Sequence, residues 1–213
     1  MRKLQRGIAP TCLNQYQPGQ NNWGSVSSGD KALIWTELDA MQGKRCAYCE
    51  ADISGNNKHI EHFRQRSRYP QGTFAWDNLF GSCNRKDSCG KHKDEQAAPY
   101  SDADLLKPDT EDPESLLVFD PNGGVSPRKG LSPQDTQRAS ETIRVFNLDG
   151  VLKAIRRSEL AGYIRTAEFF AEMAQDFPEA EWSPLLQEEI DNTTHLPFST
   201  AIKHVLTRQS AIA

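Results

Sequence analysis

The feature that most constrains the fold of this chain is a set of four cysteines grouped in two close pairs. Two residues separate Cys46 from Cys49, five separate Cys83 from Cys89, and 33 residues lie between the pairs. Thiolates are soft ligands, and four of them in a tetrahedral arrangement suit Zn²⁺. The alternative is four unrelated buried thiols. We expect a structural zinc site formed by all four, because four thiolates leave no open position for a substrate.

Charge is distributed unevenly along the chain. Residues 1–94 contain 14 Lys and Arg against 9 Asp and Glu, whereas residues 95–213 contain 11 against 20. A basic front half favours contact with a polyanion such as nucleic acid, although two differently solvated surfaces would have the same composition. No stretch approaches the roughly 20 apolar residues that cross a bilayer, and no apolar signal-peptide core follows the first residues. We therefore expect a cytoplasmic protein without membrane contact.

Local patterns predict an α+β protein with three segments. The middle segment contains both cysteine pairs, an alternating stretch at 58–63 that predicts a short strand, and room for a short helix after Cys83. The segments are an N-terminal loop and helix (1–45), a zinc-stabilised core (46–94) and an acidic, mostly helical C-terminal region (95–213).

Capping residues and prolines place the remaining elements. Asp30 is a candidate N-cap for a helix that stops at Gly43. Ser132-Pro133 and Ser183-Pro184 each combine a capping residue with a first-turn proline, so each is expected to open a helix. The other predicted elements are a linker at 99–113, a strand at 116–119, and helices at about 150–175 and 198–208.

A second group of chemically active residues lies between and just after the cysteines. It reads Ile60-Glu61-His62-Phe63, then Asn78-Leu79, then Cys89-Gly90-Lys91-His92-Lys93. This string resembles the HNH nuclease family, whose pattern is an acidic residue before a His, then Asn-Leu, then a metal-binding His or Asn near a Lys, often framed by cysteine pairs. The resemblance covers residues 46–94 and implies a ββα-metal core.

The resemblance implies a role for each residue of the string. His62 would be the general base that activates water, since its pKa lies naturally near neutrality. Asn78 would fix the loop and orient the imidazole. Glu61 would hold a divalent ion, Mg²⁺ or Mn²⁺, that polarises the phosphate. A core or surface histidine and a solvated carboxylate are the alternatives for His62 and Glu61.

One departure from the family pattern affects the second ligand of that ion. The metal-binding residue usually follows the last cysteine directly, but here that position is Gly90. We favour His92, two residues later, as the second ligand, with Asn84 as the alternative. Lys93 is expected to contact a phosphate.

Basic residues follow the strand that carries His62. Arg64, Arg66 and Arg68 occupy every second position, so in an extended loop they would point the same way, toward a nucleic-acid backbone. His59 is either a strand residue or an additional phosphate contact, and we favour the former.

Further stretches extend the resemblance over most of the chain. Trp76-Asp77-Asn78-Leu79-Phe80, Ser82-Cys83-Asn84 and the later Thr142-Ile143-Arg144-Val145-Phe146-Asn147-Leu148-Asp149 are similar to the PtuB-like HNH proteins of bacterial defence systems. Members of that group work with an ABC-type ATPase, PtuA, in Septu systems and in some retrons. The resemblance therefore implies an ATPase partner, and in retrons a reverse transcriptase with its ncRNA/msDNA.

These patterns favour an HNH endonuclease that acts as an anti-phage effector, with DNA as the favoured substrate because HNH chemistry uses water rather than the ribose 2′-hydroxyl. An effector that cleaves RNA or tRNA is one alternative. A non-catalytic zinc-knuckle module that binds nucleic acid is another, and an adaptor that bridges a partner is a third. Glu61, His62 and Asn78 favour the enzyme, because a binding module has no need for that trio.

Overall fold

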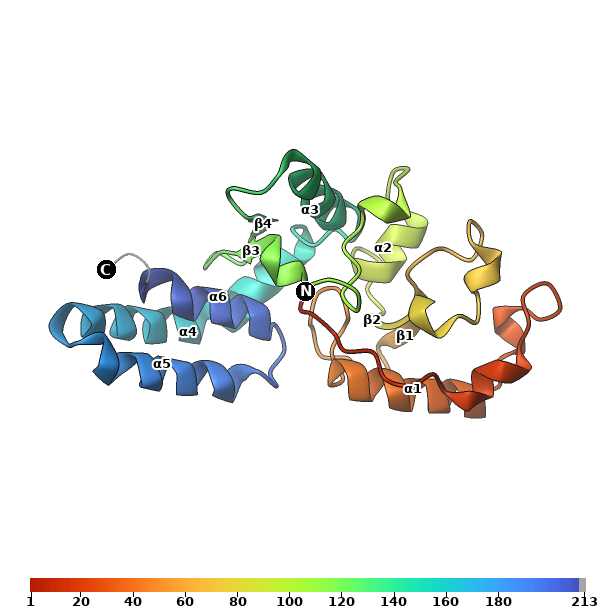
Figure 1. The fold of residues 1–213 in the computed structure, drawn as a ribbon, viewed down its shortest axis with the longest axis horizontal. Helices are drawn as coiled ribbons and strands as arrows, with labels where there is room; N and C mark the ends of the chain where they lie inside the picture. The colour runs from red at the N-terminus through yellow and green to blue at the C-terminus, as the bar shows by residue number, and fades with distance from the viewer. Residues whose placement is uncertain (211–213) are drawn as a thin grey trace.

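The computed structural model describes residues 1–210 and shows a mixed α+β protein with two small antiparallel sheets and a helical C-terminal region (Figure 1). The strands are β1 (Lys58–His62), β2 (Leu79–Cys83), β3 (Leu117–Phe119) and β4 (Val125–Pro127). The helices are α1 (Ser28–Gln42), α2 (Cys89–Glu95), α3 (Pro133–Val145), α4 (Val151–Asp176), α5 (Glu179–Thr193) and α6 (Ser199–Ser210).

Helix α1 begins slightly earlier than its sequence indicated. Ser27, rather than Asp30, is the N-cap, and its hydroxyl accepts a hydrogen bond from the Asp30 amide at 3.0 Å. The predicted stop is confirmed, since Gly43 closes the helix in the left-handed conformation, with φ at 60°. Ile34 and Leu38 are fully buried on one face, so α1 supports the edge of the hairpin beside it.

Strands β1 and β2 form the hairpin that carries the candidate site. They pair antiparallel, with Glu61 opposite Phe80 and His62 opposite Leu79. The predicted strand at 58–63 is confirmed. Helix α2, which lies in the stretch expected to be helical, packs against β2. The order of elements is therefore strand, strand, helix, with the last residues of β1 facing the helix.

The C-terminal helices α4, α5 and α6 pack side by side at one end of the molecule (Figure 1). The helix expected from Ser132-Pro133 is confirmed, with Ser132 as the cap of α3. The start predicted at Ser183-Pro184 is wrong, because α5 already begins at Glu179 and Pro184 lies inside it. Proline lacks an amide hydrogen, so at this position it costs one hydrogen bond close to the start of the helix.

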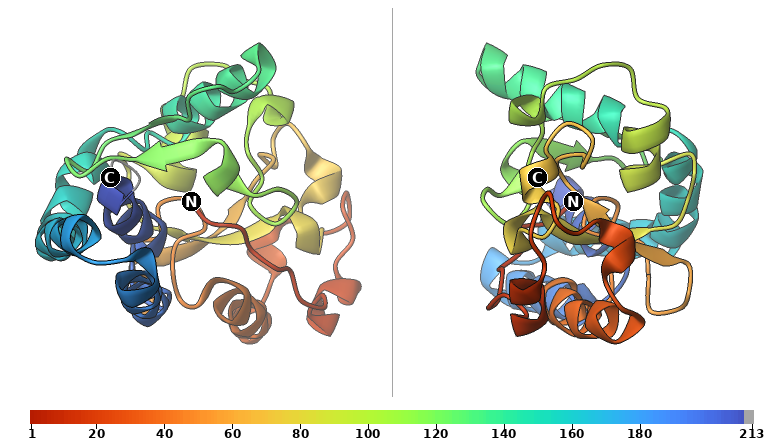
Figure 2. Two further views of the ribbon diagram at one scale, coloured as in Figure 1. Left: turned by 60° about the vertical axis from the view of Figure 1, so that its left-hand side comes forward. Right: turned by 90° about the vertical axis from the view of Figure 1, so that its right-hand side faces the viewer.

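The stretch 99–113 is packed against the rest of the protein rather than being a free linker. Leu105 and Leu106 are buried in the main core, and the Leu4 amide donates to the Pro108 carbonyl at 2.7 Å. That core runs without a break from the cysteine segments to α6. The first residues of the chain cross the middle of the molecule, as the further views in Figure 2 show.

Within residues 1–210, no helix is both long and apolar enough to cross a bilayer.

Candidate active site and cysteine cluster

The four predicted zinc ligands converge in the core. One sulfur atom from each of Cys46, Cys49, Cys83 and Cys89 lies within 4.8 Å of all the others, and all four residues are buried. The Sγ atoms of Cys49 and Cys83 are 4.0 Å apart. Zinc–sulfur bonds of about 2.3 Å place the sulfurs of a tetrahedral site roughly 3.8 Å apart. The residues therefore fit a structural Zn²⁺, and they would supply its complete ligand set.

Three separate elements deliver these sulfurs. Cys46 and Cys49 flank a turn in which the Glu50 amide donates to the Cys46 carbonyl at 3.0 Å. Cys83 ends β2 and Cys89 starts α2. Burial opposes ionisation of Cys46, but hydrogen bonds from the other three thiols lower its pKa well below the usual value. The pKa values of Cys49 and Cys89 are raised instead, so without a metal Cys46 is the thiol of the cluster that ionises most readily.

A buried arginine lies near the cysteines. Arg156 of α4 is 1% exposed and donates to the carbonyls of Gly123 and Leu148, each at 2.7 Å. Burial lowers the pKa of its guanidinium, and the sulfurs of Cys49 and Cys89 oppose that shift. Four thiolates around Zn²⁺ carry a net charge of −2, so a cation here partly balances the cluster.

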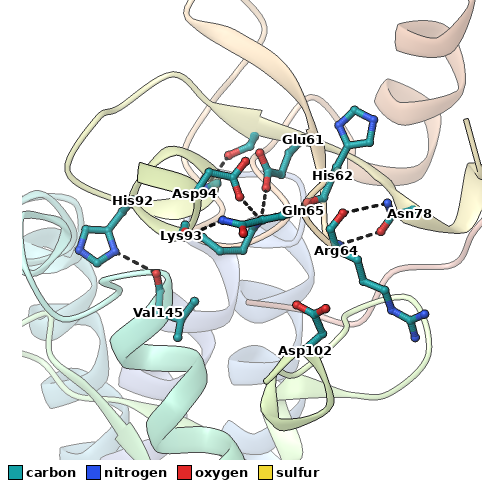
Figure 3. Close-up of polar contacts among 12 residues, drawn as sticks. Glu61, His62, Arg64, Gln65, Asn78, His92, Lys93, Asp94, Asp102 and Val145 are labelled. Atoms are coloured by element: carbon teal, nitrogen blue, oxygen red, sulfur yellow. Dashed lines mark hydrogen bonds and ion pairs between the residues drawn. The ribbon is translucent and has the colours of Figure 1, made fainter. Parts of the chain in front are cut away.

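Glu61 is the centre of a second buried polar group, shown in Figure 3. Its side chain is 3% exposed, and its Oε1 lies 2.8 Å from the Nζ atom of Lys93. Its Oε2 lies 3.1 Å from Nε2 of His59. Burial raises the pKa of Glu61, but Lys93 and His59 outweigh it and hold that pKa below the usual value. Glu61 is therefore ionised at neutral pH.

Lys93 is enclosed by oxygen atoms. Besides Glu61, its ammonium contacts Asp94 Oδ1 and donates to the main-chain oxygen of His62 at 3.1 Å. Its side chain is 0% exposed, whereas that of Asp94 is 39% exposed. Burial lowers the pKa of Lys93, but the two carboxylates outweigh this and raise it above its usual value. The ammonium of Lys93 is thus ion-paired with Glu61 and Asp94, and its contact with a phosphate stays a prediction.

His62 is held in a defined tautomer. Its Nε2 lies 2.9 Å from the Thr73 carbonyl oxygen, and because a carbonyl can only accept, Nε2 carries the hydrogen. Within the described residues Nδ1 has no hydrogen-bond partner, so its lone pair is free. The ring of Trp23 packs edge-on against the imidazole at 4.6 Å between centroids. Burial lowers the pKa of His62 to about 4, so the ring is neutral at pH 7.

Asn78 fastens the two ends of the loop that follows β1. Its Oδ1 accepts from the Arg64 amide at 2.8 Å, and its Nδ2 donates to the carbonyls of Arg64 at 3.1 Å and Gly72 at 3.0 Å. Thr73, whose carbonyl orients His62, directly follows Gly72. Asn78 thus orients the imidazole through the loop rather than by touching it.

The two residues nominated as the second metal ligand do not lie beside Glu61. His92 turns toward α3, where its Nδ1 donates to the Val145 carbonyl at 2.9 Å (Figure 3). Asn84 directly follows Cys83, which pairs with Lys58 at the start of β1. Glu61 lies near the other end of β1, where it pairs with Phe80. In this arrangement α2 and the hairpin aim both side chains away from Glu61, so the predicted pairing with Glu61 stays a prediction.

The position directly after the last cysteine is nevertheless next to Glu61. A Cβ atom added to Gly90 would lie 2.4 Å from Glu61 Oε2, which is too close for any side chain without a rearrangement. A side chain at position 90 would therefore force the Glu61 carboxylate to shift from its place against α2. Helix α2 packs tightly against the hairpin at this point. This close packing leaves no room for a metal-binding side chain at position 90, and it also brings Lys93 next to Glu61.

The basic residues after β1 do not form the expected extended row. The amides of Arg68 and Tyr69 both donate to the Gln65 carbonyl, so the loop turns here. Arg64 and Arg66 are exposed, and the guanidinium of Arg64 lies over the Tyr69 ring at 5.0 Å. Arg68 instead donates to the Tyr100 carbonyl at 2.9 Å. Arg64 and Arg66 remain the arginines best placed to meet a phosphate.

Several site residues were not anticipated from the sequence. They are Trp23 and Thr73 around His62, and Asp94 beside Lys93. Lys93 was expected at the site as a phosphate contact, but its ion pair with Glu61 was not expected. Its burial was detectable in principle, because it lies four residues after Cys89 and residues at that spacing share one face of a helix. Trp23 and Thr73 carry no such signal, since they come from irregular segments.

The family resemblance implies a divalent ion at Glu61, which the oxygen atoms around this residue would have to hold. Mg²⁺ prefers oxygen ligands at about 2.0–2.1 Å and near-octahedral geometry. The oxygens that converge at Glu61 are already neutralised by the Lys93 ammonium, which is 2.8 Å from Oε1. In this arrangement the oxygen atoms around Glu61 accommodate the Lys93 ammonium and do not fit a divalent ion.

Comparison with known proteins identifies a distant curated relative. The Septu protein PtuB of Bacillus thuringiensis is 26% identical to the chain over 166 residues, which cover 76% of the chain and 57% of that protein. The chain is a distant homologue of PtuB. No family model matches the sequence. Because the chain spans little more than half the length of PtuB, its activity and partners have to be argued from the site.

Proposed function

We propose that the chain is an HNH-type endonuclease of a Septu-like anti-phage system and hydrolyses phosphodiester bonds, with DNA as the favoured substrate. The observation that carries this proposal is His62, a neutral imidazole with Nε2 anchored to Thr73 and Nδ1 free. It directly follows the buried carboxylate Glu61, in a chain homologous to PtuB. The hairpin β1–β2 followed by α2 supports a ββα-metal core.

The proposed chemistry begins with His62. Its Nδ1 takes a proton from a water molecule, and the water oxygen bonds to phosphorus as the bond to the 3′ oxygen breaks. The departing 3′ oxygen takes a proton from solvent, which leaves a 3′-hydroxyl and a 5′-phosphate. Asn78 and Thr73 hold the imidazole in the required tautomer and orientation. Arg64 and Arg66, which are exposed on the loop that follows His62, bind the phosphate backbone. A divalent ion at Glu61 belongs to the family pattern, but Lys93 has to move before one can bind there.

The four cysteines are proposed to hold a structural Zn²⁺. It would join the turn before β1, the end of β2 and the start of α2. The Cys89 amide donates to the Phe146 carbonyl at 2.8 Å, so the same metal site is tied to the end of α3. Zinc would thereby fix the position of α2 relative to Glu61 on the hairpin, without taking part in the hydrolysis.

The C-terminal helices are proposed to bind a PtuA-like ATPase. Phe169 of α4 and Leu185 of α5 are 56% and 48% exposed. Because the core is continuous, the partner test uses the full chain with Phe169→Glu and Leu185→Glu rather than a truncation. Loss of co-elution with the co-expressed ATPase on size-exclusion chromatography is expected, and retained co-elution would refute this role for these helices.

A cleavage assay tests the nuclease proposal and separates DNA from RNA. Purified protein, alone and with the ATPase, is incubated with plasmid DNA or total RNA in Mg²⁺ or Mn²⁺. Plasmid nicking is expected, with little loss of RNA. Binding without cleavage of either substrate would contradict the proposal and favour the zinc-knuckle binding module.

A further inference from the structure

A cavity outside the candidate active site lies between the small sheet β3–β4 and helix α6. Its volume is about 840 Å³, and its wall includes Phe119 of β3, Pro127 of β4 and His204 of α6. Pockets that bind small molecules have volumes of about 300–1,000 Å³. The cavity is therefore large enough to hold a small ligand.

The wall of this cavity is basic, although it belongs to the acidic half of the chain. Residues 95–213 contain 11 Lys and Arg against 20 Asp and Glu. Four of these cations line the cavity together with two carboxylates, and the six residues are Arg128, Lys129, Lys203, Arg208, Glu114 and Asp120. A cavity lined mainly by one sign of charge concentrates ions of the opposite sign. The composition of the wall therefore favours an anion.

Most of these cations are not neutralised by the protein. Glu114 is ion-paired with Lys203, at 2.8 Å between Oε1 and Nζ. Asp120 is engaged by its own turn, because its Oδ1 accepts from the amides of Asn122 and Gly124. Among the side chains that the structure describes, none of the other three cations of the wall makes an ion pair with a carboxylate. Their charge is thus available to a ligand.

His204 and Arg128 face each other with two hydrogen-bond donors. The Phe119 amide donates to Nδ1 of His204 at 3.1 Å, so Nδ1 carries no hydrogen and Nε2 has to carry one. Nε2 lies 3.2 Å from Glu114 Oε1, which can accept that hydrogen. Nη2 of Arg128 lies 3.0 Å from the same Nε2, and a guanidinium nitrogen can only donate. At its closest contact, Nη2 therefore has no acceptor.

This conflict cannot be removed within the group. If Nε2 accepted from Arg128, the hydrogen of His204 would lie on Nδ1 and face the Phe119 amide, which is also a donor. Arg128 cannot simply turn away, because its Nε donates to the Glu114 carbonyl at 2.7 Å. Donors without an acceptor are costly where solvent is limited, and the side chain of His204 is 5% exposed. An anion oxygen in the cavity would give Nη2 the acceptor that these residues do not supply.

We propose that this cavity binds the phosphate group of a small molecule, with Arg128 as the main contact. A phosphate offers several acceptor oxygens and more than one negative charge, which suits a guanidinium held in one direction beside further cations. Lys129 and Arg208 supply those cations at the exposed side of the wall.

The volume of the cavity favours a phosphate ester over free phosphate. A phosphate group fills only a small part of about 840 Å³, and Val118, Phe119 and Pro127 add an apolar portion to the wall. The expected ligand is therefore a phosphorylated molecule of about the size of a nucleotide. This inference stands apart from the nuclease proposal, because neither Glu61 nor His62 lines the cavity.

The test is ligand binding to the full chain by isothermal titration. The probes are adenosine 5′-monophosphate, inorganic phosphate and adenosine, which separate the phosphate from the rest of an ester. The monophosphate is expected to bind at least ~10-fold more tightly than inorganic phosphate, and adenosine is expected to give no binding heat. The melting temperature is expected to rise with the monophosphate, because only the folded protein has the cavity.

Variants locate the phosphate in the cavity. Arg128→Gln is expected to weaken binding of the monophosphate by at least ~10-fold, since it removes charge-assisted hydrogen bonds. Arg165→Gln makes the same change at an exposed position of α4 outside the cavity and is expected to bind like the wild type. If Arg128→Gln does not fold, Lys129→Gln combined with Arg208→Gln replaces it. Both of those side chains are exposed, and the same loss is expected.

Absence of binding of both the monophosphate and inorganic phosphate to the wild type would overturn the inference. Wild-type affinity in Arg128→Gln would overturn it as well, because the phosphate would then bind elsewhere. Adenosine that binds as tightly as its monophosphate would refute the role of the phosphate. Equal affinity for inorganic phosphate and the monophosphate would support the phosphate contact and refute the ester. None of these measurements depends on cleavage of nucleic acid, so they leave the nuclease proposal to its own assay.

Discussion

Replacement of Asn78 by alanine is expected to loosen the loop that orients His62. The side chain of Asn78 makes three hydrogen bonds with the loop backbone and is 3% exposed. Each contributes about 0.5–1.5 kcal/mol net, and the buried groups left behind carry a further penalty. We therefore expect Asn78→Ala to lower the free energy of unfolding by about 2–4 kcal/mol.

Hydrogen exchange can localise this loss. The Arg64 amide donates directly to Asn78 Oδ1, so its exchange is expected to speed up by at least ~10-fold, more than that of amides in α5. Urea denaturation measures the global loss, and Asn192→Ala, at an exposed position in α5, is the matched control. An Asn78→Ala protein with wild-type stability and unchanged Arg64 exchange would refute the loop-fastening role.

Three other perturbations have defined outcomes. Cys49→Ser should lower zinc content measured by mass spectrometry well below one ion per chain and reduce the melting temperature, whereas Cys12→Ser should change neither. Arg156→Met should cost about 2–5 kcal/mol in urea denaturation, because two buried carbonyls lose their donor, while the exposed Arg157→Met should cost under about 0.5. The pKa of His62 falls from 6.5 to about 4 on folding, so stability is lost as pH drops through that window. Between pH 7 and 4 the wild type should lose about 3 kcal/mol more than His62→Asn, and parallel pH profiles would contradict the buried neutral imidazole.

The parts of the fold that follow from local patterns were predictable. The spacing of Cys46 and Cys49 with Cys83 and Cys89 indicated one cluster, and the sulfurs do converge. Ser132 before a proline marked the start of α3. Such signals involve neighbours in sequence, where capping and ligand spacing act directly.

The arrangement around Glu61 was not predictable in the same way. It depends on how closely α2 approaches the hairpin, and that distance is set by Gly90 and by the anchor of α2 on the end of α3. A shift of one residue along a helix turns a side chain by about 100°, which is enough to exchange His92 for Lys93 at the site. Only the packed structure decides which of the two faces Glu61.

The central claim, that His62 is the general base of a nuclease, is tested most directly by one rate measurement. Plasmid cleavage by the wild type is compared with that by His62→Ala, both with the ATPase partner, in Mg²⁺ or Mn²⁺ and with zinc content and melting temperature checked. The account predicts a loss of about 10²-fold or more in the rate with zinc retained. Cleavage by His62→Ala at the wild-type rate would contradict it.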